Sequence, residues 1–216
     1  MCFNISIAHS QESIENQFDA EFHIDFTFTS RKHISAFTNP AVPAITSENT
    51  NEIQPLRWGL IPHWVSDRKK ADAIRKMTYN AKSETVHEKP SFRNSFKNNR
   101  CIVIADGFYE WQTTSTEKIC HYITINKTSI FAFAGIFSEW TDNLTGEFIK
   151  SVSILTQSAN PMMEKIHNIK KRQPVILDSK NFSGWLDQST DYKNILENSY
   201  NIDFKSKIVN SPLKSL

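Results

Sequence analysis

Polar and apolar residues alternate over residues 3–8, where Ile5 and Ile7 fall on the same side. This period of two predicts a half-buried strand that begins directly after Cys2. The same alternation over residues 22–28 predicts a second strand. Further strands are predicted, mainly from β-branched and apolar runs, over 101–105, 122–125, 130–136, 151–156, 174–177 and 208–209.

Helix signals lie between these strands. Ser10 can cap a helix that runs to about Ala20, and residues 67–77 form a short basic helical segment. Asn160-Pro161 predicts the start of a helix over 162–166. Two further segments are predicted to be peripheral helices: Trp185-Leu186 and Ile195-Leu196.

The middle of the chain is basic and aromatic. After a polar, turn-like stretch at 47–55, residues 57–64 hold Trp58 and Trp64 and predict a rigid aromatic loop. Between Arg68 and Arg100 there are ten Lys or Arg residues and three acidic ones. Indoles are usually core and charge runs are usually solvated faces. Their combination here favours a single-stranded nucleic-acid surface on which at least one indole stacks.

Length and composition limit the number of domains and the kinds of binding site that we expect. With 216 residues, 39% of them apolar, and no internal boundary, we expect one globular domain over 1–216, with a peripheral tail from about 201. A net charge of +2 confines any nucleic-acid surface to a local patch, and five glycines argue against a glycine-rich phosphate loop.

Three cysteines without a signal peptide predict a soluble, cytoplasmic protein. No stretch is long and apolar enough to span a membrane. The histidines lack paired zinc spacing, so we expect no metal and no cofactor.

Met1-Cys2 is the stretch with the most distinctive chemistry. If Met1 is removed, Cys2 carries an α-amine and a thiol on adjacent carbons. The amine condenses with an aldehyde, and the thiol closes a thiazolidine ring on the same carbon. Such a residue is an aldehyde trap or an N-terminal nucleophile. The alternative is that Cys2 is only a small residue at the start of a strand.

Two further residues are candidates for proton transfer. Glu110 lies between aromatic residues just past a predicted buried strand, where its pKa can rise; the alternative is a surface position on a hairpin. His167 is followed by Lys170, Lys171 and Arg172, whose charges lower its pKa and favour a neutral imidazole. A lone histidine is more often structural.

These motifs together resemble the SRAP family, the SOS-response-associated peptidases or abasic-site-processing proteins. The resemblance covers nearly the whole chain in one order, through the segments Met1-Cys2, 57–62, 80–85, 89–93, 100–101, 107–111, 133–135, 166–167 and 174–177. It implies an α+β fold in which strongly curved antiparallel sheets form a barrel-like core with peripheral helices.

The resemblance also implies an activity. Family members bind abasic sites in single-stranded DNA and crosslink the open sugar to the mature Cys2 as a thiazolidine, which shields the lesion. Removal of Met1 by the protein itself and strand cleavage by β-elimination are the related peptidase and lyase activities. We expect a monomer whose partner is single-stranded DNA and which associates with the nucleoid when it is bound to DNA.

The implied active set is Cys2, Asn80, Glu110 and His167. Asn80 would orient the amine and the sugar oxygens, Glu110 would shuttle the amine proton, and His167 would protonate the ring oxygen of the closed sugar. The implied DNA contacts are phosphate binding by Lys82, Arg93 and Arg172, and stacking by Trp111, Trp58 or Trp64.

Two positions depart from the family pattern. The usual Met-Cys-Gly-Arg start is Met1-Cys2-Phe3-Asn4, and the Asn-Ala-Arg motif is Asn80-Ala81-Lys82. Lysine offers a point charge in place of a bidentate fork. Both changes affect contacts with DNA more than thiazolidine chemistry.

Three other functions fit parts of the sequence. An N-terminal-nucleophile amidotransferase or hydrolase would also use Cys2, but five glycines leave little for its loops. A passive single-stranded nucleic-acid binder would leave Cys2 inert. A peptidase acting on other proteins would require turnover of added peptides.

Overall fold

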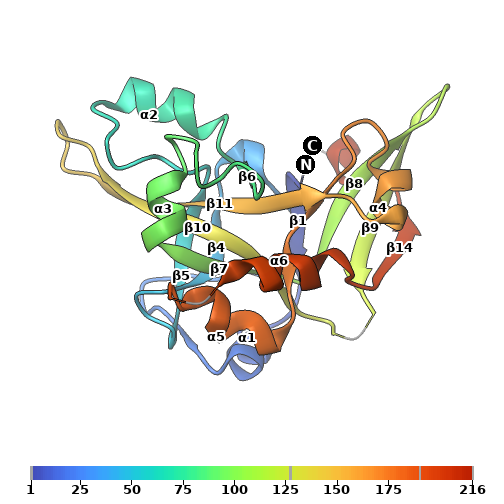
Figure 1. Ribbon diagram of the computed structural model, residues 1–216, viewed down its shortest axis with the longest axis horizontal. Coiled ribbons are helices and arrows are strands. Elements are labelled where there is room, and N and C mark those ends of the chain that lie inside the picture. Colours follow the sequence, from blue (N-terminus) through green and yellow to red (C-terminus); the bar gives the residue numbers. More distant parts are fainter. Residues whose placement is uncertain (1, 127, 190, 216) are drawn as a thin grey trace.

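The computed structural model describes residues 2–126, 128–189 and 191–215 of the chain. Its strands form two sheets (Figure 1). The smaller sheet has the order β14-β9-β8-β1-β3. Its strands are β1 (Asn4–Ile7), β3 (Arg31–Ser35), β8 (Gly107–Thr113), β9 (Lys118–Ile125) and β14 (Phe204–Ile208).

The larger sheet closes into a barrel. Five strands follow one another as β11-β10-β7-β4-β5, and β5 then pairs with β11. They are β4 (Ala41–Thr46), β5 (Glu52–Trp58), β7 (Arg100–Ala105), β10 (Phe131–Thr141) and β11 (Phe148–Ser158). The closing pair runs parallel, whereas the other four pairs are antiparallel. The expected α+β barrel is therefore confirmed, and it is mixed.

Short strands and helices complete the fold. The strands β2 (Glu21–Phe22), β6 (Asn80–Lys82), β12 (Arg172–Pro174) and β13 (Ile176–Leu177) extend the larger sheet. The α-helices are α1 (Gln11–Phe18), α2 (Arg68–Arg75), α3 (Arg93–Asn98), α4 (Pro161–Ile166), α5 (Phe182–Leu186) and α6 (Tyr192–Tyr200). Three 3₁₀ turns are η1 (Ala36–Thr38), η2 (Ser179–Asn181) and η3 (Pro212–Ser215).

The local helix signals are confirmed. Ser10, Asp67 and Asn160 occupy the N-cap positions of α1, α2 and α4, and each side chain accepts a hydrogen bond from a backbone N–H in the first turn. Pro161 then fills the first turn of α4, where no N–H donor is needed.

Two predictions are wrong. The strand expected over residues 22–28 stops at Phe22. Beyond it, Phe22, Phe26 and Phe28 pack their rings against one another at centroid distances of 4.8–6.1 Å, so tertiary packing explains the aromatic spacing. The turn expected over 47–55 is shorter, because β5 begins at Glu52.

The barrel strands supply most of the core. β7 is buried along its whole length, and β10 and β11 are buried over most of theirs. No helix among the described residues is long and apolar enough to cross a membrane.

Candidate functional site

Cys2 enters the molecule immediately before β1 and is fully buried. Asn80 begins β6, a strand held parallel to β11, and its side-chain Nδ2 donates to the Cys2 carbonyl at 2.9 Å. The other side-chain atom, Oδ1, is buried without a hydrogen-bond partner in the described chain. It is therefore an acceptor available to a group that enters beside Cys2.

Glu110 reaches the same place from β8. β1 and β8 pair with Ile5 opposite Phe108, so the register continued by two residues brings Glu110 level with Phe3. The Glu110 residue is 5% exposed, and burial raises the pKa of its carboxyl to about 7. Burial, with the Glu110 charge adding to it, also raises the pKa of the Cys2 thiol well above its usual range.

His167 is positioned by the end of α4. Its Nδ1 lies 2.8 Å from the Arg172 carbonyl, to which it donates when protonated, and 3.2 Å from the Arg172 N–H, from which it accepts in the other tautomer. Its Nε2 lies 4.0 Å from Glu110 Oε2. Asn168, the next residue, exchanges hydrogen bonds of 3.1 and 2.7 Å with the Thr113 backbone and so ties this turn to β8.

Burial lowers the pKa of His167 to about 4, and Lys170 and Arg172 add to the shift. The neutral imidazole predicted from the neighbouring cations is therefore present, but desolvation is its principal cause. A carboxyl with a pKa near 7 thus faces a neutral imidazole, an arrangement that can hold one proton and pass it on.

Arg172 does not fit the phosphate-binding role predicted for it. Its guanidinium forms a bidentate ion pair with Glu84, with Nη1–Oε1 and Nη2–Oε2 distances of 2.5 and 2.8 Å. Nη2 also donates to the Thr156 carbonyl at 2.6 Å. Arg172 therefore holds β12 to β11 and carries the carbonyl that orients His167.

The three tryptophans predicted to stack on bases differ in their exposure to solvent. Trp58 is fully buried and donates through Nε1 to the Tyr79 carbonyl at 2.9 Å, so its predicted stacking role is wrong and the indole is core. Trp64 is 52% exposed. Trp111 follows Glu110 on β8 and is partly buried. Trp64 and Trp111 thus keep surface on which a base could stack.

The two other predicted phosphate contacts are exposed. Lys82 ends β6, two residues beyond Asn80, so the alternation of the strand puts both side chains on one face. Arg93 begins α3. Among the described residues, no contact joins Arg93 to Cys2, Asn80, Glu110 or His167.

Sequence reasoning missed Phe37. This side chain is 60% exposed and packs against Phe3 and Tyr79, with ring centroids 5.1 and 5.7 Å apart. Phe3 directly follows Cys2 along the chain, and Tyr79 directly precedes Asn80. The available signal was Phe3 itself, an aromatic residue where the family pattern has glycine.

Two predictions depend on groups beyond these side chains. Met1, whose removal would free the Cys2 amine, lies outside the described residues. Within residues 2–126, 128–189 and 191–215, no group of three His, Cys, Asp or Glu side chains is placed to hold a metal ion.

The fold and this site define a mixed α+β barrel in which Cys2 lies among an asparagine, a glutamate and a histidine. A family model described as SOS response associated peptidase (SRAP) matches residues 1–214, and the chain belongs to this family.

Relatives and solved structures agree with this assignment. The chain is 33% identical over 228 residues to the abasic site processing protein YoqW of Bacillus subtilis (strain 168), covering 98% of this chain and 95% of that protein. It is 34% identical over 151 residues to the abasic site processing protein HMCES of Xenopus tropicalis, covering 61% of this chain and 44% of that protein. A crystal structure of a protein from Bacteroides thetaiotaomicron superposes with a TM-score of 0.91 at 32% identity, covering 100% and 95% of the two chains.

Proposed function

We propose that this chain captures abasic sites in single-stranded DNA as a covalent thiazolidine on Cys2, once Met1 has been removed. The observation that carries the proposal is the meeting of Cys2, which precedes β1, with Asn80 of β6 and Glu110 of β8, and with His167 4.0 Å from Glu110. Relatives that match nearly the whole chain are named abasic site processing proteins, which supports DNA with this lesion as the partner.

The proposed reaction forms two bonds at one carbon. The Cys2 amine attacks the aldehyde carbon of the open sugar, and the oxygen leaves as water to give an imine. The thiol sulfur then attacks the same carbon, and its proton ends on the ring nitrogen. One water is lost overall, and no oxidant or cofactor is needed.

Glu110 and His167 supply the proton transfers. At neutral pH a carboxyl with a pKa of about 7 is present in both protonation states, so Glu110 can take a proton from the thiol and return one to the departing hydroxyl. A neutral His167 can protonate the sugar ring oxygen only if Glu110 first passes it a proton. We therefore propose a two-residue relay in place of a lone acid.

Asn80 positions the nucleophile. Its Nδ2 fixes the Cys2 carbonyl, and its unpartnered Oδ1 can accept from the amine or from a sugar hydroxyl. Lys82 on the same face is placed to bind a phosphate beside the lesion. Trp64 and Trp111 offer stacking surfaces.

The proposal includes two side activities of the same site. Removal of Met1 by the chain itself would generate the amine, and β-elimination from the imine would cleave the strand before the ring closes. We also propose that the protein acts as a monomer.

Intact mass spectrometry of the purified protein, before and after mixing with an abasic single strand, tests the proposal. We expect loss of Met1 and then a species heavier by the oligonucleotide minus one water. Cys2→Ala should abolish this species. A passive nucleic-acid binder would instead bind the strand equally well with Cys2→Ala and never form an adduct on a denaturing gel.

A further inference from the structure

A polar cavity lies between α3, the start of β7 and α6, and neither Cys2 nor its partners line it. It has a volume of about 520 Å³. Figure 1 shows α3 and α5 in the half of the molecule opposite to β8 and β9. Four of the side chains that line the cavity are basic, and three others are polar: His87, Arg93, Lys97 and Arg100, with Asn94, Gln188 and Tyr192.

Arg100 forms the buried part of this cavity. The residue is 4% exposed, and its guanidinium carbon lies 5.1–5.4 Å from the ring centroids of Phe96, Trp185 and Tyr192. Its Nε donates to the Phe96 carbonyl at 3.3 Å. Its Nη1 is buried and has no hydrogen-bond partner in the described part of the chain. A buried, unpaired guanidinium N–H is costly, and an anion would satisfy it.

The charge around the cavity remains positive when its acids are counted. Asp187 acts electrostatically on Arg100, and Glu88 lies 3.4 Å from His87. Burial nevertheless lowers the pKa of Arg100, as expected for a cation with too little counter-charge. Among the described residues no ion pair engages Arg93 or Lys97, and both are exposed at the rim.

We propose that this cavity binds a phosphoryl group. The floor offers a fixed guanidinium donor, and the rim offers two long mobile cations, so several oxygens of one doubly charged or diester group can be met at once. A carboxylate presents its two oxygens in one plane, whereas the tetrahedral oxygens of a phosphoryl group can meet donors that come from the floor and from the rim. The group is either a backbone phosphate of a bound single strand or a free phosphate ion.

The surface between Cys2 and the cavity favours a phosphate of a bound DNA strand over a free phosphate ion. The loop over residues 83–92 leads from Lys82 to Arg93, and Trp64 donates to the Pro90 carbonyl of this loop at 3.4 Å. A strand anchored at Cys2 could follow this loop over an exposed indole to the cavity. The DNA source rests on the proposed function, whereas the phosphoryl chemistry of the cavity does not.

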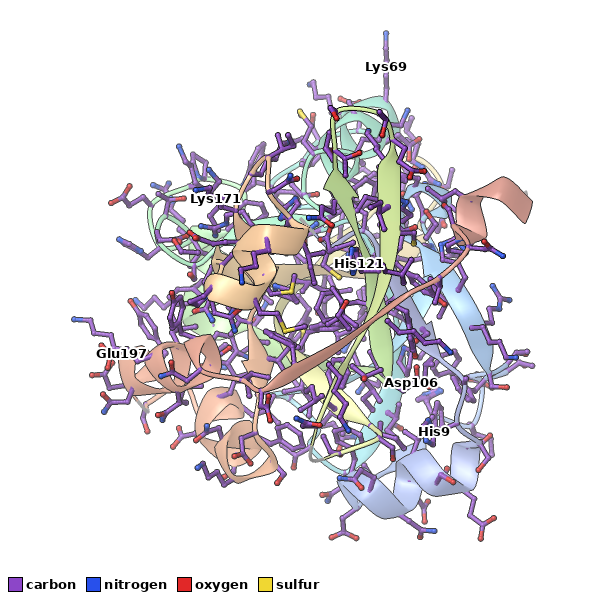
Figure 2. All side chains as sticks on the ribbon, turned by 90° about the vertical axis from the view of Figure 1, so that its right-hand side faces the viewer. His9, Lys69, Asp106, His121, Lys171 and Glu197 are labelled. Carbon is purple, nitrogen blue, oxygen red and sulfur yellow. The ribbon has the colours of Figure 1, made fainter. Side chains whose placement is uncertain are left out.

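Lys97→Gln tests the cavity without altering Cys2 or its proton-transfer partners. Inorganic phosphate titrated into the whole protein should broaden its ³¹P signal, and Lys97→Gln should weaken that binding about tenfold, as expected for one charged hydrogen bond. Lys69→Gln is the matched control, because Lys69 is an exposed lysine of α2 that projects away from the protein (Figure 2). Lysine is kept as the target because removing Arg100 would also disturb three aromatic rings.

The length of the DNA strand used in a binding experiment distinguishes a backbone phosphate from a free phosphate ion. Non-covalent binding of a long abasic single strand should weaken with Lys97→Gln and lose roughly one unit of salt slope, while a strand of a few nucleotides should be unaffected. Weakened phosphate binding with unchanged long-strand binding assigns the cavity to free phosphate. If Lys97→Gln and Lys69→Gln behave alike in both titrations, the cavity proposal is overturned. Adduct formation on the short strand reports separately on the proposed function.

Discussion

Two buried carboxylates lie close together along the chain, one just before β8 and one at its centre, and they differ in what surrounds them. Asp106 directly precedes β8 and is 6% exposed, whereas Glu110 lies within β8 and is 5% exposed. Figure 2 shows Asp106 beside His9 at the lower end of the small sheet, with His121, the cross-strand neighbour of Glu110, farther up.

Asp106 is surrounded by donors. Ser6 Oγ donates to it at 2.5 Å, the Ala8 N–H donates to its other oxygen, and His9 Nδ1 lies 3.0 Å from that oxygen. Tyr122 Oη donates at 3.4 Å. Such a carboxylate is a structural hub that joins β1, β8 and β9.

Gly107 makes room for this hub. A Cβ at this position would lie 2.3 Å from Tyr122 Oη, so only glycine lets the phenol pass to Ser6 and Asp106. Glu110, by contrast, faces an imidazole at 4.0 Å and the Cys2 thiol. The comparison teaches that burial alone does not mark a reactive carboxylate. The partners decide whether a buried carboxyl group is fixed by donors or lies beside groups that can exchange a proton with it.

The largest expected effect is at Glu110. Glu110→Gln keeps the shape but removes the exchangeable proton, so adduct formation should slow by about 10²–10⁴-fold. The melting temperature should not fall, because the variant removes a carboxylate that burial penalises. Time courses on denaturing gels and thermal unfolding measure the two quantities. A variant with a lowered melting temperature and a normal rate of adduct formation would reverse the assignment of the two carboxylates.

Asp106→Asn should show the opposite pattern. It leaves donors from Ser6 and Ala8 facing an amide and should cost about 2–4 kcal/mol in the free energy of unfolding. The adduct rate of the folded fraction should stay within about twofold of the parent, since Asp106 supplies no proton transfer. Urea unfolding and single-turnover rates test this pair of expectations. A large loss of rate without loss of stability would contradict it.

The pH dependence of stability sharpens the comparison. The pKa of Glu110 rises from 4.5 to about 7 on folding, so the folded chain binds more protons in this window and stability falls as pH rises. The pKa of His167 falls from 6.5 to about 4, so in that window stability rises with pH. The two contributions oppose each other between about pH 4.5 and 6.5.

Single variants should reveal each slope. Glu110→Gln should leave stability that increases with pH, and His167→Gln should leave stability that decreases with pH, each by at most about 3 kcal/mol. Urea unfolding between pH 4 and 7.5 measures both. Parallel curves for the two variants would mean that these groups do not carry the shifts.

The smallest effect is expected at the edge of the Asp106 hub. Tyr122→Phe removes one donor at 3.4 Å and one partner of Ser6 at 2.9 Å. It should lower the free energy of unfolding by about 1 kcal/mol and leave the adduct rate unchanged. Chemical denaturation resolves a change of this size, and a loss of crosslinking here would connect the Asp106 hub functionally to Glu110.

Much of this architecture could be predicted from local signals. Caps at Ser10, Asp67 and Asn160 mark helices, and the β-branched run before Asp106 marks β7, because these depend on neighbouring residues. The strand predicted beyond Phe22 is absent because the rings of three phenylalanines pack against one another across a turn. Such a contact produces the same spacing as a strand.

The residues of the candidate site could be named from the sequence, but the contacts between them could not. The order of motifs identifies Cys2, Glu110 and His167, yet their meeting depends on strand register over more than a hundred positions. For the same reason the sequence could not distinguish a buried Trp58 from an exposed Trp64, nor reveal that Glu84 occupies Arg172.

Locating the covalent bond tests the central claim most directly. The protein is mixed with an abasic single strand without added reductant, digested, and mapped by tandem mass spectrometry. The account predicts a sugar remnant on a peptide that starts at Cys2, with both its amine and its thiol closed to acylating and alkylating reagents. A remnant on a lysine, or an adduct formed by protein that retains Met1, would contradict it.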